Sequence, residues 1–105
     1  MKTFALQPLR IPSGWLVEYN RLTEYELKDG PEYKDLLRAD LLQLKRGKIL
    51  IFLGWYPATD PQGAYVLYKL DLNNPEPFKK PLDVFESKVK QEITDKIEQW
   101  TNEPK

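Results

Sequence analysis

The chain of 105 residues contains neither cysteine nor histidine. Without cysteine it can form no disulfide, no thiolate nucleophile and no cysteine-ligated metal site. Without histidine it lacks the commonest general base of enzymes and the commonest side-chain ligand for transition metals. We therefore expect a protein that is not an enzyme and that carries no cofactor and no metal.

The chain also lacks a net charge, because sixteen basic residues balance sixteen acidic ones. Binding to nucleic acid draws on a net basic surface or a dense basic patch, so we expect no specific nucleic-acid partner. No run of about 20 apolar residues is present to span a membrane, and segment 1–8 is too short and polar for a signal peptide. We expect a cytoplasmic protein without a membrane partner.

Strand patterns fill much of the chain, whose length suits a single globular domain over residues 1–105. Apolar residues alternate with polar ones over 15–20, and the alternation resumes over 22–27. Residues 48–56 are apolar on both faces, which is typical of a central strand, and Ala64 to Leu72 alternate well. The proline-rich segment 1–14 predicts an edge strand at most.

The residues Asp60-Pro-Gln-Gly63 predict a type I turn between the last two strands. Aspartate suits the first position of such a turn because it bonds its own backbone, proline presets φ at the second, and glycine suits the fourth. We therefore expect an antiparallel hairpin here.

Residues 31–46 fit two structures. Pro31 suits the first position of a helix, and four apolar residues then follow at helical spacing: Tyr33, Leu37, Leu41 and Leu44. The alternative makes Leu41 to Lys45 a strand that turns at Arg46-Gly47. We favour the helix, because arginine is a poor first residue for such a turn.

The C-terminal region predicts a helix with one apolar stripe, made of Phe85, Val89, Ile93, Ile97 and Trp100. We predict an α+β fold in which an antiparallel sheet of three to five strands packs against this helix, with a second helix over 31–46. On the sheet, the helix is expected to contact strand 49–55 and the side chains of Val66, Tyr68 and Leu70.

The aromatic residues near the predicted turn are the best candidates for a binding surface. Trp55 and Tyr56 end one strand, Asp60 begins the turn, and Tyr65 starts the next strand. Tryptophan and tyrosine dominate the energetics of protein interfaces, which makes these four residues candidate binding residues. They also suit the end of a hydrophobic core, because aromatic residues are favoured in strands.

Several short motifs together resemble small uncharacterised bacterial proteins of the toxin-immunity type: Pro12-Ser-Gly-Trp15, Asp40-Leu-Leu-Gln43, Gly54-Trp-Tyr-Pro57, and Asp60-Pro with Gly63. The resemblance implies a non-catalytic module that binds a protein partner such as a toxin, and it assigns no site residues. Two alternatives stay open: a structural subunit that forms a homo-oligomer, and a small carboxylate-based hydrolase or ligand-binding domain.

Overall fold

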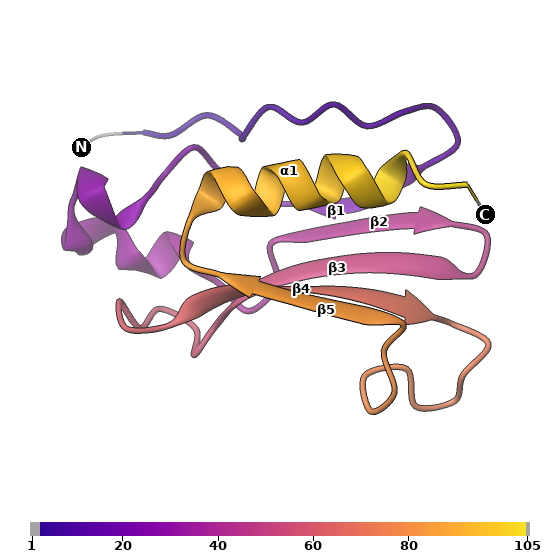
Figure 1. The fold of residues 1–105 in the computed structure, drawn as a ribbon. Helices are drawn as coiled ribbons and strands as arrows, with labels where there is room; N and C mark the ends of the chain where they lie inside the picture. Colours follow the sequence, from indigo (N-terminus) through magenta and orange to yellow (C-terminus); the bar gives the residue numbers. More distant parts are fainter. Residues whose placement is uncertain (1–2, 105) are drawn as a thin grey trace.

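A computed structural model describes residues 3–104 of the protein and shows an α+β fold (Figure 1). Five antiparallel strands form a sheet in the order of the sequence, and the C-terminal helix lies across one of its faces. The sheet contains β1 (Leu16–Asn20), β2 (Leu42–Arg46), β3 (Ile49–Tyr56), β4 (Ala64–Asp71) and β5 (Asp83–Ser87). Two short 3₁₀ helices, η1 (Leu27–Asp29) and η2 (Pro31–Leu36), lie between β1 and β2, and α1 (Lys90–Thr101) ends the chain. The predicted fold class is confirmed.

The register of β3 and β4 decides which residues form the core. Leu53 pairs with Leu67, and Trp55 pairs with Tyr65. Directly paired residues point to the same face of a sheet, and these four are buried in one core cluster with Ile93, Ile97 and Trp100 of the helix.

The prediction that Val66, Tyr68 and Leu70 face α1 is therefore wrong. Side chains alternate between the two faces of a strand, so these three lie on the face opposite to Leu67. There the ring of Tyr68 meets Phe78, from the loop between β4 and β5, in an edge-to-face contact with centroids 5.2 Å apart. Both faces of β4 carry apolar residues, so alternation alone does not show which face the helix covers.

The favoured helix over 31–46 is wrong in its second half. Only Pro31–Leu36 is helical, as the 3₁₀ helix η2, and Leu42–Arg46 is strand β2. Arg46 pairs with Ile49, so the hairpin turns at residues 47–48, one position later than the alternative prediction placed it. Gly47 has a φ of 61° and takes the first turn position, where a positive φ suits a two-residue hairpin.

The apolar stripe of the C-terminal helix is shorter than predicted. The helix begins at Lys90, so Phe85 lies outside it and pairs with Leu67 as part of β5. Val89 precedes the helix and is 52% exposed. Three of the predicted core residues, Ile93, Ile97 and Trp100, are buried as expected.

None of the helices in residues 3–104 has both the length and the apolar character that a membrane span requires.

The predicted strand over 22–27 is also wrong. This region makes one isolated bridge, between Leu6 and Thr23, and then turns into η1. The described part of the N-terminal segment runs along α1 (Figure 1), where the Arg10 backbone N–H donates to the Glu98 carboxylate. The first two residues of the predicted edge strand lie outside the described range. The bridge joins the N-terminal segment to the chain before η1, and the Arg10 contact joins it to the C-terminal part of α1.

Candidate functional site

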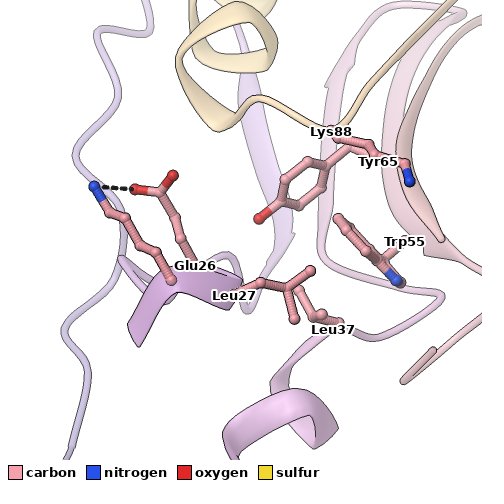
Figure 2. A pocket seen from close by; sticks show the side chains of 7 residues that line it. Glu26, Leu27, Leu37, Trp55, Tyr65 and Lys88 are labelled. Atoms are coloured by element: carbon pink, nitrogen blue, oxygen red, sulfur yellow. Dashed lines mark ion pairs between the residues drawn. The ribbon is translucent and has the colours of Figure 1, made fainter. Parts of the chain in front are cut away.

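A small pocket opens at the end of the sheet where β3 finishes and β4 begins (Figure 2). Its volume is about 150 Å³. Its lining comes from the region of η1, the residue after η2, strands β3 and β4, and the link before α1. The lining residues are Glu26, Leu27, Lys28, Leu37, Trp55, Tyr65 and Lys88. We call it the Tyr65 pocket.

The predicted turn after β3 fixes the tryptophan wall of the pocket. The Gly63 backbone N–H donates to the Asp60 carbonyl oxygen at 2.9 Å, and the Trp55 indole N–H donates to the same oxygen at 2.8 Å. A Cβ atom at position 63 would lie 2.7 Å from the indole nitrogen, so only glycine leaves the indole in this place. The turn sequence thus orients Trp55 as well as closing the hairpin.

The strand register places the second aromatic wall beside the first. Because Trp55 pairs with Tyr65, their rings meet edge to face, with centroids 4.8 Å apart and planes at 87°. Such contacts are favourable beyond the area that they bury. Leu37, which follows η2 and is 2% exposed, contributes an aliphatic wall. The inner wall is therefore rigid and mainly apolar.

The hydroxyl group of Tyr65 is the exceptional polar group of the pocket. The residue is only 3% exposed, and its hydroxyl group forms no hydrogen bond with residues 3–104, but its oxygen is not fully buried, because it faces the open pocket. Figure 2 shows the oxygen pointing away from β4 toward Glu26 and Leu27. Burial, and then the nearby charge of Glu26, raise the pKa of Tyr65, so the phenol stays neutral and remains a donor.

Three charged side chains also line the pocket: Glu26, Lys28 and Lys88. Lys28 and Glu26 form an ion pair, with nitrogen and oxygen 3.8 Å apart (Figure 2). The Asp29 carboxylate accepts a hydrogen bond from the Glu26 backbone N–H at 2.9 Å, which holds η1 in its turn. Lys88 completes the lining from the link between β5 and α1.

The structure brings together two of the four candidate binding residues. Trp55 and Tyr65 share the pocket, whereas Tyr56 lies on the opposite face and donates its hydroxyl hydrogen to the Ala39 carbonyl oxygen at 3.0 Å. The Asp60 carboxylate accepts a bond from the Gln62 backbone N–H at 2.8 Å, so its side chain serves the turn.

The sequence patterns do not point to the part of the lining that lies outside the hairpin: Glu26, Leu27, Lys28, Leu37 and Lys88. The sequence patterns predict a strand at Leu27 and a helix at Leu37, whereas the structure has Leu27 in η1 and Leu37 directly after η2. Only the return of η1 and η2 to the sheet brings these residues to Tyr65.

Comparisons with known proteins add no further information about the site. A scan against protein-family models, a search of curated proteins and a search of solved structures each found no match. The geometry of the pocket is therefore the basis for the functional proposal.

Proposed function

We propose that this protein is a non-catalytic module that binds a protein partner by accepting one partner side chain in the Tyr65 pocket. The pocket supports this through its size. Sites for small molecules usually measure roughly 300–1,000 Å³, whereas this pocket measures about 150 Å³. A cavity of about 150 Å³ holds a single benzene-sized group, which is the size of one large side chain.

The chemistry of the pocket supports the same proposal. Anchor side chains of protein interfaces lie in well-packed pockets surrounded by a polar rim. Here Leu27, Leu37 and Trp55 provide apolar walls, and Glu26 and Lys88 lie among the charged groups of the lining. The Tyr65 hydroxyl group, which faces the pocket, adds a directional contact for the anchor.

The partner that we propose is a toxin, because the motifs of the chain resemble small bacterial proteins of the immunity type. Neutralisation by binding needs no covalent chemistry, which agrees with a chain that has neither cysteine nor histidine. In this proposal the protein occupies a surface that the toxin needs for its activity.

The test is affinity capture from the native host, with the captured protein identified, purified and titrated against the wild type and two variants. Leu27→Trp fills the pocket, and we expect it to weaken binding roughly thirtyfold, as the loss of a hot-spot anchor does. Leu16→Trp is the control, because Leu16 is 60% exposed on β1, away from the pocket. Equal affinities of the two variants, both folded by circular dichroism, would contradict the proposal.

A second candidate function is self-association through the sheet face away from α1. Val84 pairs with Tyr68, whose ring contacts Phe78, which places the three on that face beside one another. Val84 and Phe78 are exposed apolar residues, and exposed apolar patches often mark interaction surfaces. Sedimentation equilibrium at high protein concentration tests this function: a monomer would exclude it.

A further inference from the structure

The Tyr65 pocket has a donor without an acceptor. The Tyr65 hydroxyl group is held in a mainly apolar site, and no described residue accepts its hydrogen. Solvent reaches this hydroxyl group in the open pocket, but an occupant that covers it must supply an acceptor, because otherwise the donor is left unsatisfied. The occupant therefore carries an acceptor at the position that the hydroxyl group reaches.

At the Tyr65 hydroxyl group the charge of Glu26 opposes an anionic acceptor, whereas its ion pair with Lys28 and the cation of Lys88 act in the opposite direction. The Glu26 carboxylate is close enough to oppose ionisation of the Tyr65 phenol, and the apolar surroundings oppose ionisation further. The same two effects act on any second anion placed beside that hydroxyl group. Glu26 also offers acceptor oxygens of its own, so a neutral group that both accepts and donates fits between Tyr65 and Glu26.

The size and the apolar walls of the pocket favour an aromatic ring as the occupant. The walls at Leu27, Leu37 and Trp55 are apolar, and the volume of about 150 Å³ equals that of a cavity that holds benzene. Tyrosine combines such a ring with a hydroxyl group that both donates and accepts, and it is enriched at interface hot spots.

We infer that the Tyr65 pocket binds the neutral phenol ring of a tyrosine side chain presented by a protein partner. The ring lies among Leu27, Leu37 and Trp55; its hydroxyl group accepts a hydrogen bond from Tyr65 and donates one to Glu26. The protein origin of the ring rests on the proposed function, whereas recognition of the phenol itself does not.

The test uses three small probes on the isolated protein: p-cresol, which is the tyrosine side chain, toluene, which lacks the hydroxyl group, and 4-methylbenzoate, which carries a charge. Affinities come from NMR titrations that follow the Trp55 indole N–H resonance. We expect p-cresol to bind more tightly than toluene by more than the roughly two- to thirteenfold of one neutral hydrogen bond, because its hydroxyl group also donates to the Glu26 carboxylate, and 4-methylbenzoate to bind most weakly.

Two variants locate the effect. Tyr65→Phe removes only the hydroxyl group and should lower the preference for p-cresol over toluene roughly two- to thirteenfold, the value of one neutral hydrogen bond, while the bond to Glu26 remains. Tyr68→Phe is the matched control, because Tyr68 lies on the same strand but on the opposite face, and it should keep the preference. Glu26→Gln should raise the affinity for 4-methylbenzoate relative to p-cresol, since it removes the repelling charge.

Equal binding of toluene and p-cresol, a preference that Tyr65→Phe leaves undiminished, or tighter binding of 4-methylbenzoate than of p-cresol would each overturn phenol recognition. If p-cresol binds as expected but the capture experiment yields no partner that depends on the pocket, phenol recognition stands and the protein source is refuted. If a partner is captured, changing its tyrosines one at a time to phenylalanine should weaken binding at one position.

Discussion

The protein should become more stable as the pH rises through mildly alkaline values, because its folded state buries the ammonium group of Lys90. Lys90 begins α1 and is 4% exposed. Its ammonium group donates to the carbonyl oxygens of Thr23 and Tyr25, each at 2.5 Å, and so fastens the chain before η1 to the helix. Burial lowers the pKa of Lys90 from 10.5 to about 8, although the charges of Glu26, Asp29 and Glu24 act in the opposite direction.

The sign follows from the difference between the folded and unfolded pKa. Below pH 8 the lysine is protonated in both states, and the folded state bears the full cost of the buried charge. Between about pH 8 and 10.5 the folded lysine is neutral while the unfolded lysine still binds a proton, so the free energy of unfolding rises. A neutral amine keeps two N–H groups, enough for both carbonyl oxygens.

The magnitude follows from the same two values. Each tenfold change in proton affinity is worth about 1.4 kcal/mol, so the full difference is worth about 3 kcal/mol. About 2 kcal/mol of this appears between about pH 7 and pH 9.5, a range below the ordinary ionisation of tyrosine.

The assay is urea unfolding of the wild type and of Lys90→Met at several pH values in this range. Lys90→Met is expected to be less stable at every pH, because it leaves two carbonyl oxygens without their donor. The gain of stability with pH should be present in the wild type and absent in Lys90→Met. Lys34→Met, which removes an exposed lysine from η2, should keep the gain. Parallel pH profiles of the wild type and Lys90→Met would refute the reasoning.

Three substitutions test the core, a close backbone approach and the pocket by the free energy of unfolding in urea. Ile93→Ala should lower the free energy of unfolding by about 2–5 kcal/mol, because Ile93 is fully buried. Val89→Ala, at an exposed position, should change it by less than about 0.5 kcal/mol. Similar losses in the two variants would mean that the helix is placed wrongly. Gly54→Ala should lower the free energy of unfolding by about 1–3 kcal/mol or more, because the new Cβ atom would lie 2.0 Å from the Ala39 carbonyl oxygen. An unchanged midpoint of urea unfolding would contradict that close approach. Tyr65→Phe should leave stability within about 0.5 kcal/mol of the wild type, and a loss above 1 kcal/mol would reveal a partner for its hydroxyl group.

The sequence by itself determined the elements whose signals are local. The turn at residues 60–63 needs only its own aspartate, proline and glycine, and the hairpin of β3 and β4 follows from two strongly apolar strands around it. The C-terminal helix shows its buried stripe at Ile93, Ile97 and Trp100 because one face of a helix repeats every three or four residues.

Only tertiary contacts determined the identity of β2, the face of β4 that the helix covers, and the Tyr65 pocket, because long-range contacts leave no local sequence pattern. Residues 42–46 fit a helix by spacing but form β2, because pairing with both β1 and β3 outweighs a weak helical preference. The face of β4 under the helix was chosen by register, since both faces are apolar. The Tyr65 pocket arose in the same way, because Leu27 and Leu37 reach Tyr65 only through the return of η1 and η2, a path set by long-range contacts such as those of Lys90.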